Sequence, residues 1–330
     1  MDVRQLRKFV SIVDLKSMSK AAQHLHVAQP ALSQQIAALE ADLGVQLLVR
    51  SPRGVEATAA GMTLYRHAQS ILHQVDEARR DVKSEGGEVS GVVAIGMPTT
   101  TAAMLAMPLL RSIRKRYPRV RLQLFESMSG YLGDLLGNGR LDFAVLFRSK
   151  ESRDVLVEPL LDEELFFMGN LNGSLQGTEA LPLTLLAGVP LVLPSAAQEL
   201  RLFVERTFAQ AEATVNVVAD LDSLPSLLAA AAEGLAGTIL PHSALGYHRS
   251  ERPIACRPLI PALHRSVSVC RLRAIPITPA ADAVHKLLVE LTVEAISSGQ
   301  WKGATLIELA GVEHHRPNFG RSMKDRVGCG

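Results

Sequence analysis

Residues 19–44 read SKAAQHLHVAQPALSQQIAALEADLG, and they predict two short helices separated by a tight break at residues 26–28. Hydroxyls at residues 17 and 19 can cap the first of these helices. Pro30 stands where the first turn of the second helix tolerates it, and Gly44 ends that helix. A third helix over residues 2–14 precedes the pair. Three short helices in about forty residues, joined by a tight turn, are typical of a helix-turn-helix module.

The second helix of the pair presents two different faces. Leu32, Ile36 and Leu39 recur at helical spacing and predict its buried side. Burying them turns another set of side chains outward near the helix N-terminus, namely Gln29, Pro30, Ser33 and Gln34. Short polar side chains there suit the major groove of DNA, where a Gln can bond an adenine edge bidentately. Because any amphipathic surface helix shows such a pattern, this helix alone does not decide for DNA binding.

The segment VQLLVRSPRGVEATAAG, residues 45–61, predicts two short extended pieces around a turn at Ser51–Gly54. Such a turn with β arms is a wing. Arg53 at its tip is a candidate for contact with the minor groove or a phosphate, supported by Arg50. A solvated turn arginine is the alternative.

A long helix is predicted from about residue 60 to residue 83. Its apolar positions alternate gaps of four and three, at Leu64, Ala68, Ile71, Val75, Ala78 and Val82. This heptad spacing is a coiled-coil seam that needs a second helix to cover it. A symmetric dimer is the simplest way to supply that helix. The charged, Gly-rich residues 84–88 then form a hinge.

From residue 91 onward, short apolar strands alternate with helices, in an order that predicts a parallel sheet covered by helices. The β-α-β-α-β pattern occurs over residues 92–147 and again over residues 191–240, so we expect two similar lobes in sequence. A strand at residues 267–272 and a helix at residues 279–297 follow. Periodicity is lost from residue 303, and residues 303–330 are predicted to be a disordered tail.

Composition excludes several classes of protein. The chain has 330 residues, of which 47% are hydrophobic, and a net charge of only +2, so charge alone does not indicate a nucleic-acid partner. Three cysteines without a CxxC pair predict neither disulfides nor zinc, and we expect no metal and no cofactor. No leader peptide and no membrane span are recognisable, which predicts a cytoplasmic protein. Catalytic motifs are missing as well, so an enzyme is not expected.

A dense set of residues resembles one family. It comprises Ser19-Lys20-Ala21-Ala22, Leu25, Gln29-Pro30-Ala31-Leu32-Ser33-Gln34-Gln35-Ile36, Leu39-Glu40, Leu43-Gly44, Leu47–Arg50, Ala57-Thr58 and Gly61. At these positions the chain resembles the LysR-type transcriptional regulators. The resemblance covers roughly residues 1–300 and is tightest in the first 66. Within that family it is most similar to the nitrogen assimilation control protein subgroup, on VAQPALSQQ and on MPLLRSIRKRYP with a later Leu-Arg after LPS.

The resemblance implies an all-α winged helix-turn-helix over residues 1–60, a linker and dimerisation helix over 61–88, and a two-lobed α/β domain like periplasmic binding proteins over 89–302. It implies double-stranded DNA, a small-molecule effector and RNA polymerase as partners, with the chain acting as a homodimer or homotetramer. Thr58 resembles a position that caps the long helix and touches phosphate. One residue departs from the family: Ala28 replaces the usual Ser or Thr before the second helix of the pair, which weakens that cap. The residues expected to bind DNA are Ser19, Gln29, Pro30, Ser33, Gln34, Arg50, Arg53 and Thr58.

In the two-lobed domain we expect the effector between the lobes, where strand ends and helix N-termini attract a carboxylate. From the first lobe the candidates are Thr99, Thr100, Thr101, Ser127, Ser129, Phe147 and Arg148; from the second they are Ser195, Arg201 and Phe203. Helix capping explains the threonines equally well. A local salt bridge explains Arg201 equally well. A solute-binding protein without a transcriptional role is the alternative function. It would match the two-lobed domain but not residues 1–66.

Overall fold

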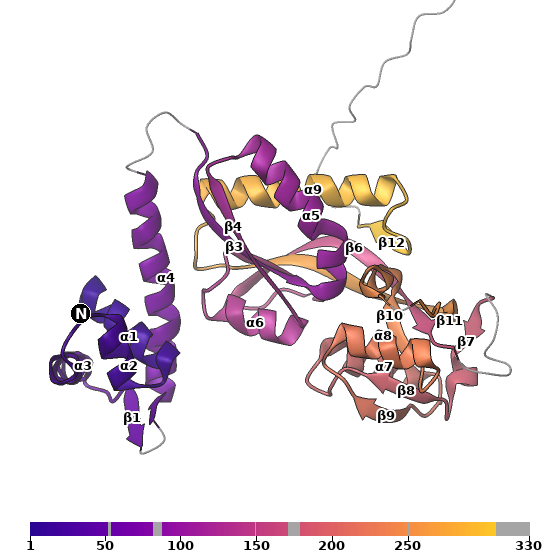
Figure 1. Ribbon diagram of the computed structural model, residues 1–330, viewed down its shortest axis with the longest axis horizontal. Coiled ribbons are helices and arrows are strands. Elements are labelled where there is room, and N and C mark those ends of the chain that lie inside the picture. Colours follow the sequence, from indigo (N-terminus) through magenta and orange to yellow (C-terminus); the bar gives the residue numbers. More distant parts are fainter. Residues whose placement is uncertain (52–53, 82–87, 149, 171–178, 250, 308–330) are drawn as a thin grey trace, which may run out of the picture.

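The computed structural model of the chain describes residues 1–51, 54–81, 88–148, 150–170, 179–249 and 251–307 (Figure 1). Its N-terminal part is a small helical module followed by a long helix. The elements of this part are α1 (Val3–Leu15), α2 (Met18–His24), α3 (Gln29–Leu43), β1 (Leu48–Ser51), β2 (Gly54–Ala57) and α4 (Ala59–Asp81).

The predicted buried face of the second helix of the pair, α3, is confirmed. Leu32, Ile36 and Leu39 of α3 are at most 1% exposed and belong to one apolar cluster with Phe9 and Ile12 of α1. Side chains cap the first two helices: Asp2 accepts from the backbone of Gln5 at α1, and Ser17 accepts from that of Lys20 at α2. By contrast, α3 begins after Ala28 without a side-chain cap. Its first-turn N–H groups are therefore left for water or a ligand.

The predicted wing is an antiparallel pair, with Leu48 opposite Ala57 and Ser51 opposite Gly54. A close backbone contact joins this wing to α4. A Cβ atom placed on Gly61 would lie 2.0 Å from the carbonyl oxygen of Leu47, a distance that no side chain tolerates. Only glycine at position 61 therefore allows the first turn of α4 to lie this close to the backbone of Leu47, the residue before β1.

The C-terminal part is an α/β domain that surrounds one large mixed sheet. Its first half contains β3 (Gly91–Pro98), α5 (Thr99–Arg116), β4 (Val120–Ser127), α6 (Ser129–Gly137), β5 (Phe143–Leu146) and β6 (Val155–Met168). Its second half contains β7 (Leu181–Pro182), η2 (Leu183–Leu186), β8 (Pro190–Leu193), α7 (Glu199–Gln210), β9 (Asn216–Asp220), α8 (Leu224–Glu233), β10 (Thr238–Pro241), η3 (His242–Tyr247), β11 (Cys256–Leu272), α9 (Pro279–Ser297) and β12 (Ala304–Leu306).

The sheet differs from the purely parallel one that we expected. Its strand order is β10-β6-β11-β5-β3-β4; β3 is parallel to β4 and β5, whereas β6 and β11 pair antiparallel with each other and with their outer neighbours. Periodicity indicated only residues 267–272 of β11 and none of β6. Both strands are long, with 14 and 17 residues, and their ends lie in different lobes.

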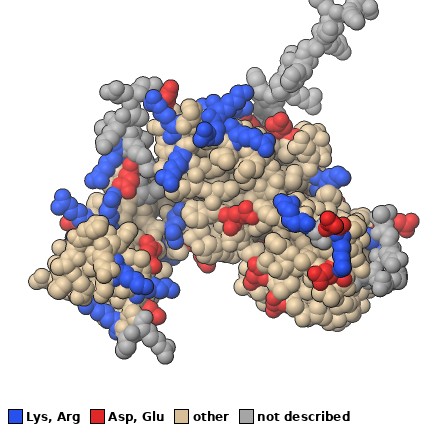
Figure 2. Space-filling model, viewed as in Figure 1, with Lys and Arg blue, Asp and Glu red and all other residues tan. Residues whose placement is uncertain are grey.

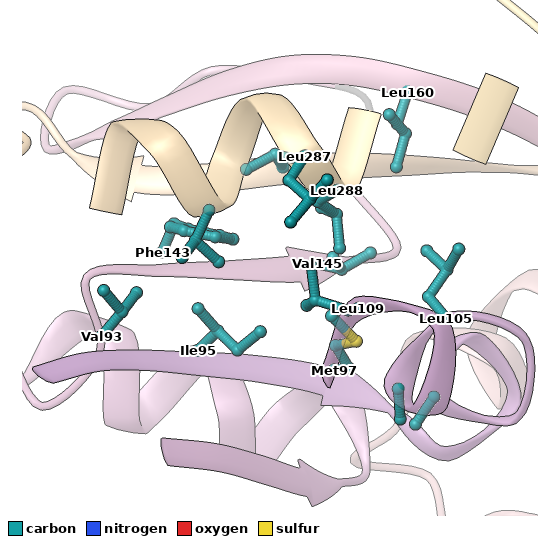
Figure 3. Close-up of a cluster of buried hydrophobic side chains, with 14 of the residues drawn as sticks. Val93, Ile95, Met97, Leu105, Leu109, Phe143, Val145, Leu160, Leu287 and Leu288 are labelled. Atoms are coloured by element: carbon teal, nitrogen blue, oxygen red, sulfur yellow. The ribbon is translucent and has the colours of Figure 1, made fainter. Parts of the chain in front are cut away.

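Each lobe has apolar clusters of its own. The first lobe packs Val93 and Ile95 of β3 against Phe143 of β5 and Leu287 of α9 (Figure 3). The second lobe has a separate core around Phe167, with residues from β8, α7 and α8. Because β6 and β11 contribute residues to both cores, the lobes are not consecutive in sequence, and the chain crosses between them twice.

The predicted disordered tail begins too early. Residues Ala304–Leu306 form β12, which pairs antiparallel with residues 161–163 of β6. Trp301, just before this strand, is only 2% exposed. A few apolar residues without periodicity thus complete the edge of a sheet, which a search for helical or alternating patterns does not detect. Residues 308–330 of the predicted tail, like residues 82–87 of the predicted linker and hinge, lie outside the described residues.

Candidate DNA-binding surface and effector cavity

The outward face of α3 carries the polar side chains expected from the sequence. Gln29, Pro30 and Gln34 are exposed, and Ser33 is half-exposed. Ser19 is exposed as well, on α2. The face opposite the buried leucines is therefore open for contact with another molecule.

The wing reaches this face through Arg50. The guanidinium Nη1 of Arg50 donates a hydrogen bond to Oγ of Ser33 over 2.9 Å, so a cation of β1 lies beside the first turns of α3. On the other side, Lys8 of α1 donates to the side-chain oxygen of Gln35. These two contacts bring positive charge to both sides of α3. Arg53, the predicted contact at the wing tip, lies outside the described residues.

Thr58 has a local partner for each hydrogen-bonding role of its hydroxyl. Its Oγ1 donates to the carbonyl oxygen of Gln46 over 2.8 Å and accepts from the backbone N–H of Gly61 over 3.0 Å. The second bond is the helix cap implied for this residue by the resemblance. Since the single hydroxyl proton is already donated to Gln46, it is not available to a phosphate.

A cavity of about 50 Å³ lies where the two lobes meet. Residues from lobe one, including Thr99, Thr100 and Ser127, face residues from lobe two, including Leu224 and Leu227. It adjoins a wider cleft of about 670 Å³. Phe147, Glu199, Leu200 and Arg265 line both spaces, which we call the inner cavity and the outer cleft.

Four helices begin at the inner cavity, and none of them has a side-chain cap. The first residue of each helix lines the cavity: Thr99 of α5, Ser129 of α6, Glu199 of α7 and Leu224 of α8. Among the other described helices, α1, α2, α4 and α9 are each capped by a side chain, and α3 is without such a cap. Uncapped N-termini leave first-turn N–H groups without a partner and concentrate positive helix-dipole charge at this cavity.

Arg265 of β11 is the buried cation of the cavity wall. Its Nη2 lies 2.7 Å from Oε2 of Glu163, and the two side chains are 7% and 0% exposed. The same Nη2 donates to Oγ1 of Thr100 over 2.9 Å, and the guanidinium stacks on Phe147 at 3.6 Å from the ring centre. Glu163 in turn accepts hydrogen bonds from Ser243 and Trp301. This network joins both lobes and the C-terminal segment.

The outer cleft carries more positive than negative charge. Its wall includes the cations Arg148, Lys150 and Arg206, and Glu199 is an acidic residue among them. Partial burial raises the pKa of the Glu199 carboxyl, while Arg148 and Arg206 act in the opposite direction. Glu151, the other acidic residue of the cleft wall, forms an ion pair with Arg273 over 2.8 Å. An anion is therefore favoured over a cation in this space.

The structure brings most of the sequence-predicted effector residues to this place. Five of them line the inner cavity, namely Thr99, Thr100, Ser127, Ser129 and Phe147. Arg148 and Phe203 line the outer cleft. The Oγ of Ser129 is buried without a hydrogen-bond partner among the described residues, so it is free to bind a ligand.

Three predicted effector residues lie elsewhere. Thr101 is fully buried and lines neither space. Ser195 binds Asp222 through both its backbone N–H and its hydroxyl. Arg201 forms ion pairs with Glu205 and Asp220, at 2.6 Å and 2.7 Å. These are local salt bridges, the alternative to an effector contact for this residue.

Arg265, Glu163 and Glu199 are the residues that sequence reasoning missed. Arg265 and Glu163 are 102 positions apart, and both lie in parts of β11 and β6 that periodicity did not indicate as strand. No local signal announces such a pair. Glu199 could have been found, since it is an acidic residue at a predicted helix start, where it complements the helix dipole.

The described residues contain no group of three or more His, Cys, Asp or Glu side chains that could hold a metal ion. In the same part of the chain, no helix is both long enough and apolar enough to cross a membrane.

Comparison with protein families accounts for both halves of the chain. Residues 3–62 match the model of the bacterial regulatory helix-turn-helix protein of the lysR family, and residues 86–292 match that of the LysR substrate binding domain. The chain belongs to the LysR family. It is thus a LysR-type transcriptional regulator with a DNA-binding helix-turn-helix and an effector-binding domain, and it forms oligomers. The alternative of a solute-binding protein without a transcriptional role is wrong, because residues 3–62 belong to the regulator family.

Among similar regulators, the nitrogen assimilation regulatory protein nac of Klebsiella aerogenes is 36% identical over 88% of this chain and 95% of its own length. Its counterpart in Escherichia coli K12 is 36% identical over 92% of this chain and 99% of its own. The structure of a full-length OxyR variant from Pseudomonas aeruginosa has a TM-score of 0.69 with 25% identity, covering 89% of this LysR regulator and 95% of that chain. CbnR, a LysR family transcriptional regulator, shares the fold with a TM-score of 0.63 and 22% identity. The match covers 88% of this chain and 99% of the CbnR chain.

Proposed function

We propose that this LysR-type regulator is switched by a small anion bound in the inner cavity and outer cleft. The observation that carries this proposal is the convergence of four uncapped helix N-termini on one cavity, at Thr99, Ser129, Glu199 and Leu224. Free N–H groups and the helix dipoles bind negative charge at such positions. A carboxylate, the most common small organic anion, is the group that we expect there.

The placement of the cavity supports a role in switching. Its walls come from both lobes, so a ligand that binds both walls favours one relative orientation of the lobes over others. A ligand can shift such an equilibrium only by its difference in affinity for the two states. Arg148 of lobe one and Arg206 of lobe two both line the outer cleft, which gives an anion contacts on either side.

For the DNA-binding half, we propose that Gln29, Pro30, Ser33 and Gln34 of α3 contact bases in the major groove, with Arg50 beside them. Exposure of these side chains and the bond between Arg50 and Ser33 support this assignment. We propose further that α4 pairs with its copy in a second chain. Ile71 on the predicted seam is 37% exposed in the single chain, which leaves an apolar side chain for a partner to cover.

We also propose that the protein acts in the cytoplasm by binding alone, without catalysing a reaction. Membership of a bacterial DNA-binding family supports the cytoplasmic location, because the bacterial chromosome lies in that compartment. Two regulators similar to this chain are named for nitrogen assimilation, and we propose that its target genes serve nitrogen metabolism too. Transcript levels in a deletion strain under nitrogen limitation test this assignment, and genes of nitrogen use that do not respond would contradict it.

The anion proposal is tested by calorimetric titration of the full chain with acetate, succinate and sulfate. We expect saturable binding of at least one of them, together with a change in the affinity for promoter DNA. Arg148→Ala should weaken that binding about tenfold, as for the loss of one charge-assisted contact.

A matched control removes one positive charge elsewhere. Basic side chains gather over the C-terminal end of α5, where the last turn contains Arg114, Lys115 and Arg116 (Figure 2). Arg114→Ala lowers the net charge as much as Arg148→Ala does but leaves the outer cleft intact. Equal effects of the two variants would mean that anions respond to overall charge, and the proposed site would be wrong.

A further inference from the structure

The inner cavity and the outer cleft differ in chemistry, and Arg265 stands where they join. The outer cleft has the charged wall described above, whereas the inner cavity is lined mostly by apolar side chains. Its apolar lining includes Met128, Phe147, Leu200, Leu224, Leu227 and Leu240. A ligand that fills both spaces therefore needs a charged part and an apolar part.

A charged group would be unfavourable deep in the inner cavity. Leu224, Leu227 and Leu240 are at most 5% exposed and offer no hydrogen bonds. Moving a polar group from water to such a wall without a hydrogen-bond partner is unfavourable, and moving a charge there is more unfavourable still. Burial of an alkyl group against the same wall is favourable, because it removes apolar surface from water.

The size of the inner cavity restricts the apolar part. An apolar cavity of about 150 Å³ is known to hold a benzene molecule. The inner cavity has about one third of that volume, 50 Å³. It therefore fits an alkyl group of about two or three carbon atoms and is too small for an aromatic ring.

The position of the carboxylate follows from Arg265, which lines both spaces. Its Nε and Nη2 donate to Glu163 and Thr100, whereas its Nη1 takes part in none of the hydrogen bonds found among the described residues. Arginine keeps its charge at any physiological pH, so Nη1 is a permanent donor. In the wall of the same cavity, Thr99 and Ser129 begin two uncapped helices. A carboxylate at this junction meets donors from β11, α5 and α6.

We propose that the effector is a short aliphatic carboxylate, with its carboxylate between Arg265 and the helix N-termini and its alkyl group among Met128, Leu224 and Leu227. The inference rests on the proposed anion site and adds to it the chemical class of the ligand. It separates short aliphatic acids from aromatic acids, inorganic anions and uncharged analogues.

Isobutyrate, isobutyramide, benzoate and sulfate distinguish these classes in calorimetric titrations of the full chain. Isobutyramide has the shape of isobutyrate without the charge, and benzoate has the charge with a larger apolar part. We expect isobutyrate to bind at least tenfold more tightly than each of the other three. Isobutyrate, and none of the others at equal concentration, should also change the affinity for promoter DNA.

The only tryptophan of the chain reports where the ligand binds. Trp301 is 2% exposed, and its Nε1 donates to Glu163, the partner of Arg265, over 3.0 Å. Isobutyrate should therefore change the fluorescence of Trp301 with the same dissociation constant that calorimetry gives. A calorimetric signal with unchanged Trp301 fluorescence would place the ligand elsewhere and overturn the proposal.

A variant of the apolar wall tests the size argument. Met128→Ala shortens a half-buried side chain in the loop before α6, so it enlarges the inner cavity without opening either apolar core. Benzoate should then bind at least tenfold more tightly than it binds the unaltered chain. If Met128→Ala binds benzoate no more tightly than the unaltered chain does, the argument that cavity size excludes an aromatic ring is wrong.

The remaining outcomes separate the two proposals. If benzoate or sulfate binds the unaltered chain more tightly than isobutyrate does, the aliphatic class is wrong and the anion site stands. If isobutyramide matches isobutyrate, the carboxylate contact with Arg265 is wrong. If none of the four compounds, nor acetate or succinate, binds at all, the proposed anion site fails as well.

Discussion

Arg265 and Glu163 face each other across two neighbouring strands and form a buried ion pair. They are register partners in β11 and β6, and Nη2 of the arginine lies 2.7 Å from Oε2 of the glutamate. One oxygen of Glu163 receives the guanidinium, and the other receives Ser243 and Trp301. Both carboxylate oxygens are thus used inside the protein, and the Glu163 side chain is fully buried.

Removing the charge of Glu163 should destabilise the effector domain. Glu163→Gln leaves Arg265 buried without its counter-ion, which costs about 3–5 kcal/mol. Thermal unfolding of the full chain, followed by Trp301 fluorescence, measures this loss. The double variant Glu163→Leu with Arg265→Met removes both charges and should recover most of the stability. A single variant as stable as the unaltered chain would show that the pair contributes little.

Arg50 and Ser33 should act on DNA as a coupled pair. Arg50→Ala removes a cation beside α3, so we expect weaker binding to every sequence and a salt slope reduced by about 1. Ser33→Ala should cost roughly 1–3 kcal/mol of discrimination between operator and random DNA. Because the two side chains are hydrogen-bonded, the double variant should deviate from additivity by about 0.5 kcal/mol or more. Fluorescence anisotropy at several salt concentrations measures all three effects, and strict additivity would contradict the coupling.

Gly61→Ala should disrupt the junction of the wing and α4. The added Cβ would lie 2.0 Å from the Leu47 carbonyl oxygen, so the backbone must move. We expect specific DNA binding to fall at least tenfold and the helix-turn-helix to unfold at a lower temperature. Gly133→Ala is the matched control, since its Cβ meets nothing within 4 Å and alanine favours a helix by up to about 1 kcal/mol. Equal melting temperatures for the two variants would refute the steric argument.

Peroxide should leave DNA binding by the Cys329→Ala variant unchanged, although OxyR proteins share this fold. Burial raises the pKa of the Cys256 thiol to about 11 and that of Cys270 to about 12. These raised pKa values keep both thiols protonated near pH 7. Since the thiolate is the form that reacts, neither thiol should react readily with peroxide. Cys329 lies outside the described residues, so Cys329→Ala isolates the other two. A loss of DNA affinity in that variant after peroxide treatment would overturn this prediction.

The helix-turn-helix could be predicted because its signals are local. Leu32, Ile36 and Leu39 are buried as their spacing requires, and the two strands of the predicted wing pair from Leu48 and Ala57 to Ser51 and Gly54. In the effector domain, strand ends and helix starts indicated five residues that line the inner cavity. Arg201 shows the limit of this reasoning, since a helix start near the right place can still direct its side chain to Glu205 and Asp220.

The sequence by itself determined the elements whose residues are neighbours along the chain: three short helices, a wing, a long heptad helix and the α/β alternation. These follow from periods of 3.6 and 2 and from capping residues within a few positions. Only the tertiary structure decided that β6 and β11 cross both lobes, that β12 completes the sheet, and that Arg265 meets Glu163. The physical reason is sequence separation: Arg265 and Glu163 are 102 residues apart, and the charge attraction and hydrogen bonds that offset the desolvation of this buried pair exist only once the strands have paired.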